Sequence, residues 1–133
     1  MEITTYDPKK VTVIINGRAM TGFAEDGVIT LTHNEDMVTP SVGSKGDVAY
    51  SENANNSGNA ALPLMSTSAS IAFLQEICAK RKPVQISIMD ANSAAGMNVS
   101  EENCRILKMP DTPRGKEQST VTVNVYIPSL NYR

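Results

Sequence analysis

The sequence predicts a mostly β protein: an antiparallel β-sandwich or partly closed barrel of about seven to eight strands with one flanking α-helix. Three observations lead to this prediction. Short β-branched runs alternate between apolar and polar residues in much of the chain. Clusters of turn-forming residues separate these runs. One stretch near the middle has apolar residues at helical spacing.

Length, charge and composition narrow the possibilities further. The 133 residues suit one domain, expected over 1–133, which can bury a core without disulfides or metal. Cys78 and Cys104 are therefore expected to be free thiols, with a disulfide as the alternative. A net charge of −2 and 5% aromatic residues argue against a protein that grips phosphates or stacks bases. Without a long apolar run or signal segment, we expect no membrane partner.

The first part of the chain is expected to form three strands. Residues 11–15 (VTVII) are β-branched and end at Asn16-Gly17, a dipeptide that suits a two-residue hairpin turn. Residues 18–23 then form the returning strand, and residues 27–32 form a third strand.

Two polar stretches follow. Residues 33–47 contain turn formers without a clear period, which predicts a long loop. Residues 51–64, SENANNSGNAALPL, change abruptly from polar to apolar. We interpret them as the tip of a hairpin between strands 48–53 and 59–65, since the chain is too short for a linker between two cores.

Residues 66–82, STSASIAFLQEICAKRK, predict the helix, over about 67–82. A serine or threonine at 66–68 caps its start, and Pro83 ends it. The basic residues 80–82 are interpreted as a charged helix end favoured by the helix dipole, rather than as a phosphate site. The face expected to pack on the sheet consists of Ile71, Leu74, Ile77 and Cys78. The residues expected to point outward are Gln75, Glu76 and Lys82.

The C-terminal part predicts three further strands, 84–90, 102–109 and 119–127, the last two separated by loop 110–118. Alternation places one set of side chains inward: Val84, Ile86, Ile88, Val121, Val123, Val125 and Ile127. The opposite faces carry uncharged polar residues: Gln85, Ser87, Thr120, Thr122 and Asn124. These faces are either ordinary threonine-rich strand surface or surfaces that meet other copies of the chain or line a shared cavity.

A search for chemistry finds little. The segment 33–36, HNED, is the strongest candidate for a metal or acid–base site, but a lone histidine without a second His or Cys nearby is a weak metal signal. No nucleophile, phosphate-loop or dinucleotide motif is present. We therefore expect no enzyme activity and no cofactor.

Several short motifs carry a resemblance over nearly the whole chain. They are YDP at 6–8 with a following V-x-V, TGF at 21–23, VG-x-x-G at 42–46, S-x-N-x-N-x-S-G at 51–58 and MPD at 109–111. With a serine-rich helix start and a final Thr/Val strand, this pattern resembles the tail tube proteins of contractile-tailed phages.

The resemblance implies a fold shared with type VI secretion ring proteins. It implies six copies in a ring, and rings stacked into a tube within the phage virion tail, assembled in the host bacterial cytoplasm. The implied partners are other copies of the chain, the tail sheath protein, the baseplate and the tail terminator, with DNA passing through the lumen unbound. The alternatives are a monomeric β-sandwich binding module, the tube of a headless phage-tail-like particle, and a small enzyme.

Three groups of residues are candidates for assembly. The inter-ring contact loop is expected to use Val38, Pro40, Ser41, Gly43, Lys45 and Gly46. The hairpin interface is expected to use Asn53, Asn55, Asn56 and Gly58. A DNA conduit should not hold phosphates, so the lumen is expected to be polar and acidic. The lumen candidates are Glu35, Asp36, Asp47 and Glu52.

Overall fold

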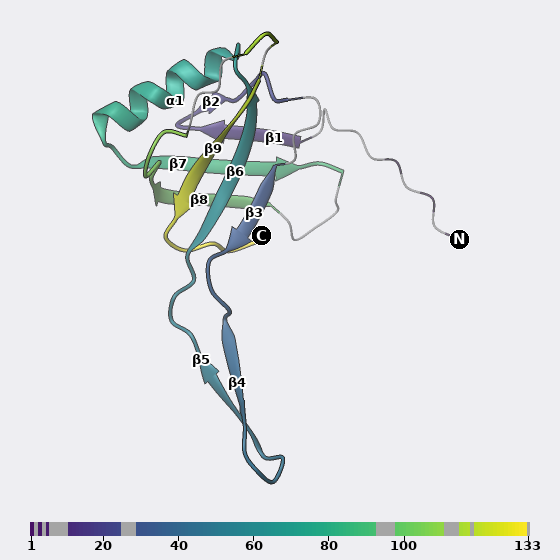
Figure 1. Cartoon of the computed structure of the whole chain (residues 1–133). Coiled ribbons are helices and arrows are strands. Elements are labelled where there is room, and N and C mark those ends of the chain that lie inside the picture. The colour runs from purple at the N-terminus through teal and green to yellow at the C-terminus, as the bar shows by residue number, and fades with distance from the viewer. Residues whose placement is uncertain are drawn as a thin grey trace.

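The computed structural model describes residues 1, 3, 5, 11–24, 29–92, 98–110, 115–117 and 119–132. In this part of the chain the secondary structure comprises nine strands and one helix (Figure 1). In order, these are β1 (Val11–Ile15), β2 (Arg18–Ala19), β3 (Thr30–His33), β4 (Val38–Val42), β5 (Val48–Glu52), β6 (Gly58–Met65), α1 (Ala69–Lys80), β7 (Val84–Asp90), β8 (Val99–Cys104) and β9 (Thr120–Ile127).

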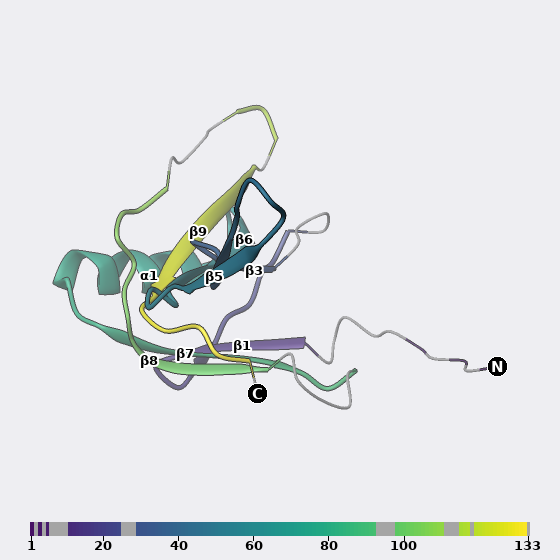
Figure 2. The same ribbon diagram turned by 90° about the horizontal axis from the view of Figure 1, so that it is seen from below.

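The strands form two packed sheets and one projecting pair. One sheet has the order β2-β1-β7-β8, the second has the order β3-β6-β9, and β4 pairs only with β5. All paired strands are antiparallel. Figure 2 shows the two sheets as separate layers, with α1 beside them. The predicted fold class is thus confirmed as a sandwich rather than a closed barrel.

Alternating side chains from the two sheets fill the core. In β9 every second residue from Val121 to Ile127 is buried, and the intervening Thr120, Thr122 and Asn124 are exposed. β7 buries Val84, Ile86 and Ile88 in the same way. The inward sets predicted for both strands are confirmed, because a period of two places alternate residues on opposite faces of a sheet.

Helix α1 is shorter than the predicted span because its caps lie inside that span. The Ser68 hydroxyl accepts a hydrogen bond from the Ser70 backbone N–H and caps the start. Arg81 adopts a left-handed conformation with φ 55°, which ends the helix before Pro83. Leu74 is fully buried, and the rest of the predicted apolar face packs partly buried against the core. Gln75, Glu76 and Lys82 are exposed, as predicted.

The prediction for the middle of the chain is wrong. The expected loop 33–47 contains β4, and β5 pairs with β4 rather than with β6. β6 lies instead between β3 and β9. The physical reason is burial: β6 contributes the buried residues Ala60, Leu62 and Leu64, so it occupies the centre of a sheet, whereas every residue of β5 is exposed.

Three other predicted strands have different bounds. The strand expected over 102–109 ends at Cys104, after a register irregularity opposite β7, and Arg105 forms an isolated bridge with Tyr126. The returning strand expected over 18–23 pairs only at Arg18–Ala19. The strand expected over 27–32 is observed from Thr30, and residues 25–28 lie outside the described residues. Most of the predicted loop 110–118 also lies outside them.

Gly58, at the start of β6, lies where the surrounding residues leave no room for a side chain. A Cβ there would lie 2.5 Å from a Leu130 methyl carbon and 2.7 Å from the Thr32 carbonyl oxygen. We expect Gly58→Ala to lower the free energy of unfolding by about 1–3 kcal/mol through overpacking. Chemical denaturation measures this. Gly115→Ala is the control, because a Cβ there meets no heavy atom within 4 Å, and equal losses for the two variants would contradict the packing argument.

Both cysteines are free thiols, as predicted, with Cys78 half-buried and Cys104 buried. Burial, with a smaller contribution from the Glu101 carboxylate, raises the pKa of the Cys104 thiol to about 11. At pH 8 roughly one Cys104 in a thousand is then a reactive thiolate. We expect a Cys78→Ser variant to react with a thiol-specific disulfide reagent only after unfolding. Rapid labelling of the folded variant would contradict this.

Candidate assembly surface

The pair β4–β5, residues 38–52, forms a two-stranded ribbon that projects from one end of the sandwich (Figure 1). Every residue of both strands is exposed. An isolated two-stranded hairpin is at best marginally stable in water. The ribbon therefore contributes little to the hydrophobic core of the chain, and no described residue covers its strands.

The two faces of the ribbon differ in chemistry. Directly opposed residues of an antiparallel pair share a face, so the strand register assigns each side chain. One face is mainly apolar and carries Val38, Pro40, Val42, Val48 and Tyr50, with Glu52 beside them. The other face carries Thr39, Ser41, Ala49 and Ser51. Val42 and Tyr50 are 70% and 71% exposed, so the apolar face is uncovered in the single chain.

A tight turn closes the ribbon. The Gly43 N–H donates to the Asp47 carbonyl at 2.7 Å, and the Gly46 N–H donates to the Gly43 carbonyl at 3.0 Å. Gly46 has φ 88°, which a residue with a side chain rarely adopts. Lys45 and Asp47 are exposed at this tip.

Residues 34–37 and 53–57 form a neck that joins the ribbon to the sandwich. The Asn53 amide donates to the Asp36 carbonyl, and the Asn55 amide donates to the Glu35 carboxylate. Asn56 reaches the C-terminal segment, where its amide donates to the Leu130 carbonyl at 3.1 Å. Asn53, Asn55 and Asn56, from the stretch 51–64, therefore form side-chain hydrogen bonds at the base of the ribbon and do not lie at the tip of a hairpin.

The sequence-predicted site residues fall mainly on the ribbon and the neck. All six candidates for the inter-ring loop lie on the exposed ribbon. Asn53, Asn55 and Asn56 lie in the neck, whereas Gly58 is buried within the sandwich. The lumen candidates Glu35 and Asp36 belong to the neck. Asp47 and Glu52 belong to the ribbon, so none of the four lies on a sandwich sheet.

The outer faces of the sandwich carry no charge among their described, register-assigned strand positions. On β3-β6-β9 this face includes Thr30, Thr32, Asn59, Ala61, Thr122 and Asn124. On β1-β7-β8 it includes Thr12, Ile14, Gln85, Ser87, Met89 and Ser100. These register-assigned positions thus consist of hydroxyls, amides and apolar groups, whereas β8 also carries the exposed Glu102 outside the assigned register.

Sequence reasoning missed the exposed residues Val42, Val48 and Tyr50 as members of the apolar face of the ribbon. A signal was present, because apolar residues alternate at Val38, Pro40 and Val42 and again at Val48 and Tyr50. A period of two in an exposed, glycine-closed segment is typical of a hairpin whose apolar face packs on something outside its own core.

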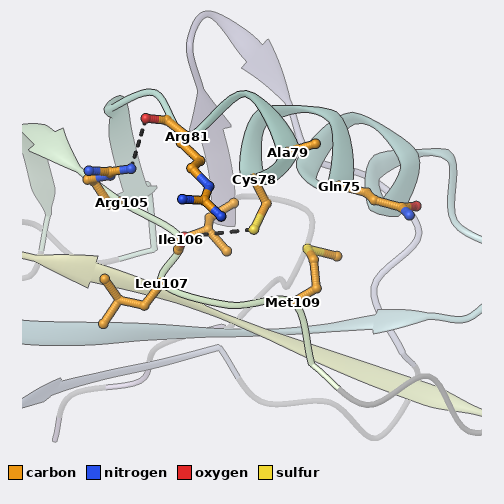
Figure 3. Close-up of a pocket in the computed structure, with 8 residues that line it drawn as sticks. All are labelled: Gln75, Cys78, Ala79, Arg81, Arg105, Ile106, Leu107 and Met109. Atoms are coloured by element: carbon orange, nitrogen blue, oxygen red, sulfur yellow. Dashed lines mark hydrogen bonds between the residues drawn. The ribbon is translucent and has the colours of Figure 1, made fainter.

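A second surface feature lies between the C-terminal half of α1 and segment 105–109, which together line a hollow of about 730 Å³ (Figure 3). The Arg105 guanidinium donates to the Arg81 backbone carbonyl at 2.8 Å, which fixes the Arg105 side chain beside Arg81 in the hollow. Cys78, Ile106 and Met109 provide apolar wall. A smaller hollow of about 310 Å³ adjoins it, shares Leu107 and includes Lys108.

The remaining candidate for chemistry, the segment 33–36, gains no support as a metal site. His33 bonds through Nε2 to the Leu130 carbonyl oxygen at 3.1 Å and packs edge-on against Tyr132. Within the described residues, no group of three or more His, Cys, Asp or Glu side chains is placed to hold a metal ion. The described part also contains no helix with the length and apolar character to span a membrane.

Comparison with known proteins gives a likeness of fold. No family model and no curated protein matches the chain. The sheath/tube terminator of the extracellular contractile injection system PVC, in its extended state, aligns with a TM-score of 0.56 and 10% identity over 98% of both chains. The tube-terminating cap of the anti-feeding prophage aligns with a TM-score of 0.54 and 10% identity over 100% of this chain and 93% of that chain.

Proposed function

We propose that this chain is a structural, non-enzymatic subunit of the tube assembly of a contractile, phage-tail-like particle. The carrying observation is the exposed apolar face of the ribbon, which a solitary subunit would leave in water. Apolar burial is the main favourable term in protein association. A β-ribbon that reaches away from its own core is suited to packing on another copy.

The fold likeness supports the same class of assembly, because both structural neighbours are described as tube-terminating components, one of them in a contractile injection system. In the finer form of the proposal, six copies make a ring, and rings stack into a hollow tube inside a sheath in a virion tail. The register-assigned outer positions of both sheets contain no lysine or arginine, which suits a conduit for DNA, since such a wall does not hold phosphates by counterion release.

A second candidate within this class is a terminator or cap. It is favoured by the descriptions of the two neighbours rather than by a feature of this chain. A tube subunit must bind a further ring on both sides, whereas a terminator closes one end. Both roles allow ring formation, so the observation that distinguishes them is whether rings stack on one another.

Sedimentation and negative-stain electron microscopy of the purified protein test the proposal. We expect rings, and at high concentration stacked tubes. Single rings that never stack would favour the terminator or cap. A species that stays near the 14.3 kDa of one chain at high concentration would contradict the proposal and favour a monomeric binding module.

A further inference from the structure

The two hollows beside segment 105–109 form one surface, here called the basic groove. Among the described residues, their combined lining includes three cations, Arg81, Arg105 and Lys108, and no acidic side chain. Leu107 lines both hollows and is 71% exposed. The larger hollow is within the size range of about 300–1,000 Å³ that is usual for binding clefts. An occupant that matches this groove combines apolar side chains with carboxylates.

The ribbon and neck of the same chain have that composition. Residues 34–57 contain four carboxylates and one amine, Lys45. No ion pair in the described part of the chain involves these carboxylates. Of the four, Asp47 and Glu52 lie on the ribbon itself, next to Val48 and Tyr50.

The arrangement of the fold prevents the ribbon from filling its own groove. Figure 1 shows the ribbon projecting from the end of the sandwich away from α1, whose C-terminal half forms one wall of the groove. The neck supports this direction, because side-chain bonds tie its two sides to each other, to the C-terminal segment and to β6. The ribbon can therefore reach the groove of a second copy only.

We propose that the basic groove is the receptor for the ribbon of a neighbouring copy. Val42, Val48 and Tyr50 then cover Leu107 and the apolar wall, and Asp47 and Glu52 face the cations. This inference rests on the proposed function and names the partner surface within it. Such a contact joins two different patches, so it repeats head-to-tail and generates a closed ring or an open stack.

Charge reversal on each side tests the contact. The ribbon variant carries Asp47→Lys and Glu52→Lys, and the groove variant carries Arg81→Glu and Lys108→Glu. Arg105 is left unchanged because it holds the Arg81 carbonyl. Each variant alone places like charges together, so we expect its assembly to need at least about tenfold more protein than the parent. Lys116→Glu, an exposed reversal away from the groove lining, should assemble like the parent.

Mixing the two variants gives the decisive result. In the mixture each reversed ribbon meets a reversed groove, and each unaltered ribbon meets an unaltered groove, so assembly should return. Combining all four substitutions in one chain should also restore it, and circular dichroism melting should show that each variant is folded. Normal assembly of the groove variant alone, or no recovery on mixing, would overturn the inference and leave the groove for another partner. Failure of the parent protein to assemble would overturn the proposed function itself.

Discussion

Replacing the ribbon, residues 38–52, with a short Gly/Ser turn should abolish assembly and leave the sandwich folded. All strand residues of the ribbon are exposed, so the replacement removes no core side chain. Ordering a residue costs about 1–2 kcal/mol of backbone entropy, and a lone hairpin recovers little of it. In an assembly the neighbouring copy supplies the missing burial, and each lost contact is repeated around the ring.

Circular dichroism melting and electron microscopy of the same preparation measure both halves of this prediction. The thermal midpoint should stay close to that of the parent, while rings and tubes disappear.

A second pair of variants tests the two faces of the ribbon separately. Val42→Ser with Tyr50→Ser should weaken assembly, whereas Thr39→Ala with Ser51→Ala, on the polar face, should not. Normal tubes without the ribbon would exclude it as an assembly element, and global unfolding would show that it belongs to the core.

The ribbon was hidden from sequence reasoning for a physical reason. Proline is rare in strands, so Pro40 argues against one, and Gly43 and Gly46 indicate a turn. The sequence of the segment therefore resembles that of a loop. Its alternation is visible, but a strand is usually recognised by the apolar face that it buries in its own core. The apolar face of the ribbon is not buried in the single chain. A search for strands that bury a face in their own core therefore misses the ribbon.

The prediction for the asparagine-rich stretch 51–64 was wrong for a different reason. Its composition correctly indicated local turn geometry, and Asn55 bonds to the backbone N–H of Ser57 two residues later. The side-chain amide of Asn56, however, bonds to the C-terminal segment, where the Leu130 carbonyl is 74 residues away in the sequence. No local pattern contains such a pairing, so the neck could be found only in the structure. The basic groove was missed likewise, because it depends on segment 105–109 leaving the expected strand.

Elements that bury one face were predicted well. The strands β7 and β9 and the apolar face of α1 follow directly from residue period, because each has a polar side and a side that packs on the core. The length of α1 was overestimated by a few residues at each end. Capping depends on which hydroxyl-bearing residue adopts the extended conformation, and the sequence offered three candidates at 66–68, of which Ser68 is the cap.

Leu74→Ala should cause a large loss of stability. Leu74 is 0% exposed and is the fully buried apolar side chain of α1, so it connects the helix to the sandwich. Truncation removes apolar contacts and leaves a cavity that the neighbouring strands fill only in part. We expect the free energy of unfolding to fall by about 2–5 kcal/mol, measured by chemical denaturation with the slope of the transition unchanged.

Gln75→Ala is the matched control, because Gln75 is the next residue of the helix and is exposed. It should change the free energy of unfolding by less than about 0.5 kcal/mol. A loss below about 1 kcal/mol for Leu74→Ala would mean that the helix is not anchored through this residue. Leu74→Ala also complements the ribbon replacement. The Leu74→Ala substitution should destabilise the subunit itself, so its loss of assembly with temperature should follow its melting curve. The ribbon replacement should instead prevent assembly at temperatures at which the subunit stays folded.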